Sequence, residues 1–282
     1  MERVKERYQA IDDKSEDLRD YLATYREKGQ AFLARYEMSW IYHDSALEGV
    51  VYSPQELAAA LQGEHVKPTE ASLMPLILDI RNHKAVVDYV REEARTGGKK
   101  VAQITLTQIK RMHDLFSGNT PEAQAARALA ERRERTEKEL AKEKEKSGFR
   151  KDMPLHRTYF HEIAPPAKIP ILLEKLVDYT ASAEFREHHP IEQASLVQHQ
   201  FLHIFPFAEH SGKVGRMCSN LILLRHHYLP CVIHSIDRQK YYEALRGTAA
   251  SFRLLLVDAM DNSLENALKF FRDQSRRYRA IN

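Results

Sequence analysis

The chain has 282 residues, and its 43 Lys and Arg residues against 40 Asp and Glu residues give a formal net charge of +3. This near balance argues against a general nucleic-acid-binding protein, and 43% hydrophobic with 29% charged residues excludes disordered and collagen-like chains. Only 10 Gly and 11 Pro leave little turn material for many short strands and indicate long helices, while 14 His is a high count.

The sequence contains no membrane or secretion signal that we recognise. No stretch approaches the roughly 18 uninterrupted apolar residues of a membrane span, and residues 1–20 are charged where a secretory signal is apolar. We therefore expect a cytoplasmic protein with no membrane partner, unless a non-classical route exports it. Cys218 and Cys231 lack CxxC spacing and are expected to be buried free thiols.

The first part of the chain predicts helices. Apolar residues recur at steps of three and four from residue 1 to about 61. Ser53 can cap a new helix there, with Pro54 in the first turn and Glu56 completing a capping box. Two further helices are expected. The first spans 73–96 and is ended by a glycine pair, and the second spans 106–117 and is ended by a Gly-Asn pair.

The second part begins with a charged segment. Residues 122–146 are almost wholly Ala, Glu, Lys, Arg and Leu, which predicts an exposed helix laced with weak ion pairs. Residues 148–163 contain a short β-capable stretch and are the best hairpin candidate. Four helices are expected after it: 169–183, 191–204, 212–227 and 238–271.

A junction between two of these helices carries the candidate chemistry. One helix ends near Ile204, and the next opens at Gly212 with Lys213 and Arg216 in its first turns. A helix N-terminus presents unpaired N–H groups and a positive dipole end, so an anion can bind there. Glu209 would hold a Mg²⁺ ion that bridges phosphates. The alternative is that these residues form only a solvated helix cap.

This junction resembles the central motif of Fic (Fido) proteins, HPFx(D/E)GNGRxxR. Pro206, Phe207, Glu209, Gly212 and Arg216 match the motif. The departures are Phe205 for the histidine, His210 for the first glycine, Ser211 for the asparagine and Lys213 for the first arginine. By resemblance, the nucleotide or phosphate would bind Glu209, His210, Ser211, Gly212, Lys213 and Arg216, with ATP and Mg²⁺ as ligands.

The flanks of the junction resemble the same family, from about residue 33 to residue 271. Residues 44–49 are similar to the inhibitory helix motif (S/T)xxxE(G/N), with Asp44 at the expected position, Ser45 one place late, and Glu48 as the inhibitory glutamate. Residues Arg157, Thr158, Tyr159, Phe160 and His161 resemble the family's flap, along which a protein partner would dock by strand addition.

The resemblance implies a fold class and a division of the chain. The fold is expected to be mainly α, a Fic-fold helical bundle with a short β-hairpin flap. Residues 1–100 would form an N-terminal helical region that includes an inhibitory-type helix at about 31–49. Residues 101–282 would form the Fic core, with the charged helix at about 121–147 as an insertion.

The departures from the Fic motif affect the reaction that the resemblance implies. Active Fic enzymes transfer AMP, or occasionally another phosphate-containing group, from a nucleotide to a protein hydroxyl, with the motif histidine as base. Phe205 cannot accept a proton, and loss of a positioned base typically costs about 10²–10⁴ in rate. We therefore predict a pseudoenzyme that binds nucleotide or phosphate weakly, and Glu48 paired with Arg216 would then serve chiefly as a structural clasp.

Other interpretations stay open at the level of sequence. A diverged nucleotidyl- or phosphotransferase would use His210 as base and Glu209 on the metal, whereas a pure interaction module would bind a protein and no nucleotide. His203 lies on the wrong helical face to replace the base. His199 and His203 have the spacing of zinc ligands, but no HExxH motif accompanies them, so a packed histidine pair is expected. Glu48 can also be a solvated residue at a helix end.

Overall fold

The computed structural model of the protein describes residues 2–61, 74–97, 103–118, 148–154 and 161–279. The helices of the N-terminal part are α1 (Glu2–Thr24), α2 (Arg26–Leu47), α3 (Pro54–Leu61), α4 (Met74–Thr96) and α5 (Leu106–Phe116). Those that follow are α8 (Ile169–Ala181), α9 (Ala183–Glu187), α10 (Pro190–Ile204), α11 (Ser211–Arg225), α12 (Arg238–Arg246) and α13 (Ala249–Arg279). Two 3₁₀ turns lie at Pro166–Lys168 and Ser235–Asp237.

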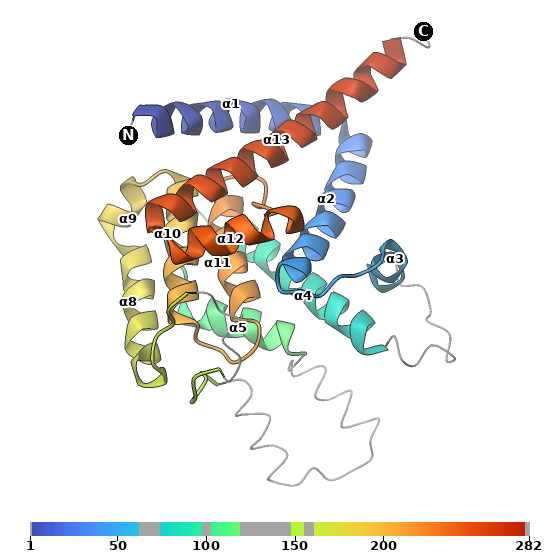
Figure 1. Ribbon diagram of the computed structural model, residues 1–282. Coiled ribbons are helices and arrows are strands. Elements are labelled where there is room, and N and C mark those ends of the chain that lie inside the picture. Colours follow the sequence, from blue (N-terminus) through green and yellow to red (C-terminus); the bar gives the residue numbers. More distant parts are fainter. Residues whose placement is uncertain (1, 62–73, 98–102, 119–147, 155–160, 280–282) are drawn as a thin grey trace.

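The mainly α prediction is confirmed (Figure 1), whereas the short β-hairpin is not seen. No strand occurs in the described ranges, and the ends of the predicted hairpin, 148–154 and 161–163, are irregular. Residues 155–160 and the expected charged insertion at 121–147 lie outside the described residues. The proposed boundary at residue 100 also falls outside them, so the division into two parts stays a prediction.

The predicted capping box at the start of α3 is present. The backbone N–H of Ser53 donates to Glu56 Oε2 at 2.6 Å, and the backbone N–H of Glu56 donates to Ser53 Oγ at 3.2 Å. These reciprocal bonds satisfy two N–H groups that the first turn of a helix leaves unpaired. The start of α3 is therefore fixed by local sequence.

Two predicted helices are divided in the structure. The expected helix over 238–271 stops at Arg246, because Gly247 takes an extended conformation with ψ −153°. Thr248 then accepts a bond from the backbone N–H of Ser251 at 3.2 Å and starts α13. The helix expected over 169–183 ends at Ala181, because Ser182 is extended and caps the short α9. Hydroxyl side chains that compete for backbone donors explain both breaks.

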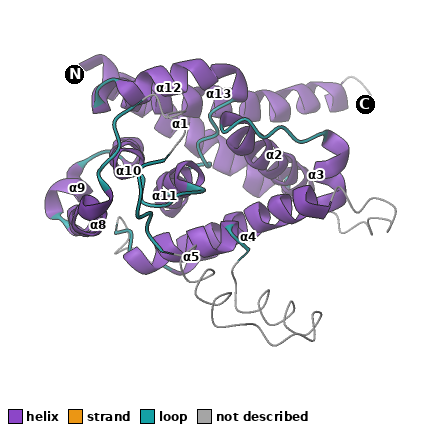
Figure 2. Cartoon of the chain, turned by 60° about the horizontal axis from the view of Figure 1, so that its bottom comes forward, coloured by secondary structure: helices purple, strands orange, loops and turns teal. Residues whose placement is uncertain are grey.

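Helix α11 lies in the middle of the bundle (Figure 2), in contact with α2, α4, α5 and α10. Residues 213–223 are all buried, so this helix is covered on every side, including at its polar members such as Lys213 and Arg216. Helices α1 and α13 cross one another at one end of the molecule (Figure 1). The position of the candidate junction between α10 and α11 is thus fixed by a helix that is buried in the middle of the bundle.

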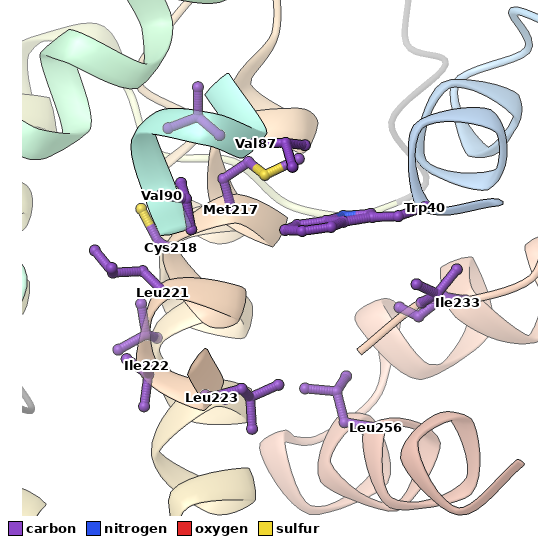
Figure 3. Close-up of a cluster of buried hydrophobic side chains, with 14 of the residues drawn as sticks. Trp40, Val87, Val90, Met217, Cys218, Leu221, Ile222, Leu223, Ile233 and Leu256 are labelled. Atoms are coloured by element: carbon purple, nitrogen blue, oxygen red, sulfur yellow. The ribbon is translucent and has the colours of Figure 1, made fainter. Parts of the chain in front are cut away.

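The core joins α11 to the N-terminal and C-terminal helices. Figure 3 shows Trp40 of α2 beside Met217 of α11, with Val87 of α4 and Leu256 of α13 in the same cluster. All four side chains are almost completely buried. In the described part of the chain, no helix combines the length and the apolar character that a membrane crossing requires.

Candidate functional site

The turn between α10 and α11 begins with a bulky residue in an unusual conformation. Phe205 caps α10 with φ 47° and ψ 65°, in the left-handed region, and its side chain is buried. A non-glycine residue costs roughly 1–2 kcal/mol in that region. The phenyl ring of Phe205 therefore sits in the core and in a strained turn.

Arg150 holds this turn from outside the two helices. Its Nε donates to the carbonyl of Phe205 at 2.6 Å, and its backbone N–H donates to the carbonyl of Pro206 at 2.9 Å. The guanidinium also donates to the carbonyls of Asp152 and Ala164. Sequence reasoning missed Arg150, because its partners are backbone carbonyls that no motif marks.

His210 is the second left-handed residue of the turn, with φ 63°, and it precedes the first residue of α11. Its ring is stacked on Phe116 of α5, with ring centroids 5.7 Å apart. Burial and the nearby charge of Lys213 lower the pKa of His210. The ring is therefore neutral at pH 7, which leaves it able to accept a proton.

Ser211 closes the turn on itself. Its hydroxyl accepts from the backbone N–H of Phe207 at 2.8 Å and donates to the carbonyl of Phe207 at 2.9 Å. The Phe207 ring is buried and stacks on His113, with centroids 3.9 Å apart. In this conformation the one O–H of Ser211 is donated to the carbonyl of Phe207.

Glu48 reaches the N-terminus of α11 from the end of α2. Its Oε1 accepts from Arg216 Nη2 at 2.8 Å, and a Cβ added to Gly212 would overlap that same oxygen. Only a glycine at position 212 lets the carboxylate approach the helix so closely. The structure thus brings together three residues singled out from the sequence, Glu48, Gly212 and Arg216.

Arg216 is bound more strongly by a second acid of α2. Its Nε forms a short ion pair with Asp44 Oδ1, and its Nη2 donates to the Asp44 backbone carbonyl at 3.1 Å. The other carboxylate oxygen of Asp44 lies 3.2 Å from His83 Nε2. Burial raises the pKa of Asp44, but the charge of Arg216 and the contact with His83 outweigh it and bring the pKa to about 2.

Lys213 forms an ion pair with an acid of a neighbouring helix. It is 3% exposed, and its Nζ lies 3.5 Å from Asp79 Oδ2 on α4 and 5.7 Å from the centre of the Phe116 ring. Asp79 also accepts a short hydrogen bond from the hydroxyl of Tyr52. No motif marks the pairing of Lys213 with Asp79, which lie 134 positions apart in the sequence.

Glu209, the candidate metal ligand, is exposed at the tip of the turn. Across the described ranges, no group of three His, Cys, Asp or Glu residues could hold a metal ion. Mg²⁺ is usually bound by one or two carboxylates together with phosphate oxygens. Glu209 therefore fits Mg²⁺ only when a nucleotide supplies the remaining oxygens.

The histidines away from the turn pack against one another. The rings of His199 and His203 lie 4.3 Å apart, and His203 Nδ1 donates to the carbonyl of His199 at 2.9 Å. His161 Nε2 donates to the carbonyl of Leu202 at 2.9 Å. Burial lowers the pKa of His199 to about 4. The four other candidate flap residues, 157–160, lie outside the described residues.

The two cysteines are free, as expected. Cys218 is buried and Cys231 is partly buried. Burial raises the pKa of each thiol to about 12, so both remain protonated and unreactive at pH 7.

The helical fold is similar to that of solved Fic proteins. The solved structure of Fic-1 (residues 134–508) from C. elegans superposes with a TM-score of 0.70 at 17% identity, covering 96% of this chain and 73% of that one. A Fic domain-containing signaling protein from Bacteroides thetaiotaomicron gives a TM-score of 0.68 at 18% identity, covering 95% and 97%. A sequence model of the Fic/DOC family matches residues 103–223. The match to this family model therefore covers less than half of the chain, while the fold of the whole chain is similar to that of solved Fic proteins.

Curated relatives match a shorter stretch. The protein adenylyltransferase Fic of Drosophila willistoni is 28% identical over 104 residues, which cover 36% of this chain and 21% of the relative. The protein of that name from Aedes aegypti is 27% identical over a stretch of equal length. The match therefore spans about a fifth of the length of these curated relatives.

Proposed function

We propose that the protein is a Fic-family pseudoenzyme, which binds the phosphates of a nucleotide weakly and acts through a protein partner. The observation that carries the proposal is Phe205 at the end of α10, buried in a left-handed turn. A phenyl ring has no atom that accepts a proton. The relatives are named adenylyltransferases, and by resemblance their base occupies this position.

The N-terminus of α11 supports the binding of an anion. A carboxylate of the protein itself, Glu48, already lies there against Gly212 and Arg216. Backbone N–H groups and the helix dipole favour negative charge at this end of a helix. A phosphate group would meet the same surroundings once Glu48 withdraws, and Glu209 would share Mg²⁺ with it.

A second candidate function is a diverged transferase in which His210 is the base. One observation favours it: the His210 ring is neutral at pH 7 and lies beside the N-terminus of α11. His210 N–H or N atoms would then have to reach a target hydroxyl from a ring stacked on Phe116. This stacking opposes the role, and we rank it second.

Labelled ATP with Mg²⁺ separates these functions. We expect calorimetry to detect weak ATP binding to Glu48→Gly, and no label to appear on that variant or on proteins of a cell lysate. Phe205→His in the Glu48→Gly background is the matched control, because it places a histidine at the position assigned to the base.

Transfer of label by Glu48→Gly with Phe205 in place would overturn the pseudoenzyme proposal. Loss of that transfer in Glu48→Gly/His210→Ala would then assign the base to His210. Absence of ATP binding to every variant would leave a protein-interaction module as the function.

A further inference from the structure

Lys213 is locked by a group of side chains that does not include Glu48. Its Nζ lies 3.5 Å from Asp79 Oδ2, and the hydroxyl of Tyr52 donates to the same carboxylate oxygen. Asp79 comes from α4, and Tyr52 from the link between α2 and α3. The Phe116 ring covers the ammonium group at 5.7 Å. Three elements outside α11 therefore decide where Lys213 points.

Within the described residues, both cations in the first turns of α11 are paired with carboxylates. Arg216 is paired with Asp44 and Glu48, and Lys213 is paired with Asp79. Withdrawal of Glu48 alone would leave each cation with one carboxylate partner. The N-terminus of α11 would then be accessible to a phosphate, but the charges of Lys213 and Arg216 would still be neutralised by carboxylates.

The surroundings favour the ionised pair of Asp79 and Lys213. Burial raises the pKa of Asp79, but the charge of Lys213 and the hydrogen bond from Tyr52 outweigh it, so the pKa lies below its usual range. Asp79 is 31% exposed and Lys213 only 3% exposed. The carboxylate can therefore reach water when the pair opens, whereas Lys213 must turn to find another anion.

We propose that Asp79 is a positioning residue that keeps Lys213 in an ion pair and so withholds its charge from a phosphate. Two carboxylates then close the phosphate site, Glu48 on Arg216 and Asp79 on Lys213. Release of Lys213 adds a second cation for the polyphosphate group of a nucleotide. The binding half of this inference rests on the proposed function. The lock itself does not, because it is a property of the protein without ligand.

The first experiment measures the lock without any ligand. Acetylation of Lys213 by an amine-reactive reagent is followed by mass spectrometry in the wild type, Asp79→Asn and Asp79→Glu. We expect about tenfold faster acetylation in Asp79→Asn, since a hydrogen bond to a charged group is worth about that factor or more. Asp79→Glu should restore protection. Asp88→Asn is the matched control, because Asp88 lies on the same helix and pairs with Lys84 instead.

Tyr52→Phe gives a milder test that keeps both charges. It removes only the hydroxyl that donates to Asp79, and acetylation of Lys213 should rise by less than in Asp79→Asn. This variant also serves if Asp79→Asn does not fold. Equal acetylation rates in the wild type and every folded variant of these two positions would overturn the lock.

The second experiment measures binding of ATP with Mg²⁺ by calorimetry. We expect the Glu48→Gly/Asp79→Asn variant to bind about tenfold more tightly than Glu48→Gly, because Lys213 contributes a charge-assisted contact. Equal affinity of the two variants would overturn the inference and leave the proposed function intact. No binding to either, with Lys213 acetylated faster, would overturn the proposed function and leave only the lock.

Discussion

Replacement of Arg216 by methionine would remove the cation on which the interior of the site depends. The side chain is 6% exposed, and it binds the carboxylate and the carbonyl of Asp44 as well as Glu48. Asp44 is itself 4% exposed and, among the described residues, would keep the contact with His83. Breaking a buried pair by removal of one partner costs about 3–5 kcal/mol, so we expect a loss of that size in the free energy of unfolding at pH 7.

The loss in the free energy of unfolding should become smaller in acid. The direction of this change follows from the pKa of Asp44. In the wild type this pKa is about 2, below its value in the unfolded chain. The group therefore contributes roughly 2–3 kcal/mol above pH 4, and this contribution is lost as the pH falls toward 2. Without Arg216, burial dominates and the pKa of Asp44 rises. Asp44 of the variant then takes up a proton at higher pH than Asp44 of the wild type does. The difference in the free energy of unfolding between the two proteins therefore narrows as the pH falls.

Urea denaturation of both proteins between pH 7 and pH 3 measures this effect. Arg7→Met is the matched control, since Arg7 pairs with Asp258 at 2.7 Å but is 36% exposed, and its loss should cost no more than about 1 kcal/mol. The Arg216→Met/Asp44→Asn double variant should be more stable than Arg216→Met alone. A deficit for Arg216→Met below about 1 kcal/mol, or one that does not change with pH, would refute the reasoning.

Three further variants test the turn and its neighbours. Gly212→Ala should lower stability by about 1–3 kcal/mol, because its Cβ would overlap Glu48 Oε1, and thermal melting should find a smaller loss in a Glu48→Ala background. Ser211→Ala should cost about 1–3 kcal/mol in urea denaturation, since it leaves the buried N–H of Phe207 without a partner; a neutral result would contradict that bond. Arg150→Met should speed hydrogen exchange at the end of α10 more than at its start, and uniform exchange would argue against its role there.

Much of the helical fold could be predicted from local sequence. The capping box of Ser53 and Glu56 is written in residues three positions apart, and the structure contains it. The break at Gly247 was missed because a single glycine is tolerated in many helices. Here Thr248, directly after it, offers a competing cap, and together they end one helix and start the next.

The site was predictable only where it resembles a known motif. Arg216 and Glu48 were found because the family pattern marks both, and the structure brings them within 2.8 Å of each other. The partners of Lys213 were not found, because Asp79 lies on a helix with no motif. Tertiary pairing between distant helices depends on how they pack, which neither periodicity nor composition specifies.

The chain contains one tryptophan, Trp40, and its place in the core offers an optical probe. It is 1% exposed and lies one turn before Asp44 on α2, beside Met217 of α11 (Figure 3). Its fluorescence therefore reports on the contact between α2, which is capped by Glu48 at its C-terminus, and α11, whose N-terminus Glu48 reaches. A red shift of the emission when a partner or nucleotide is added would report that α2 moves off α11, without any introduced label.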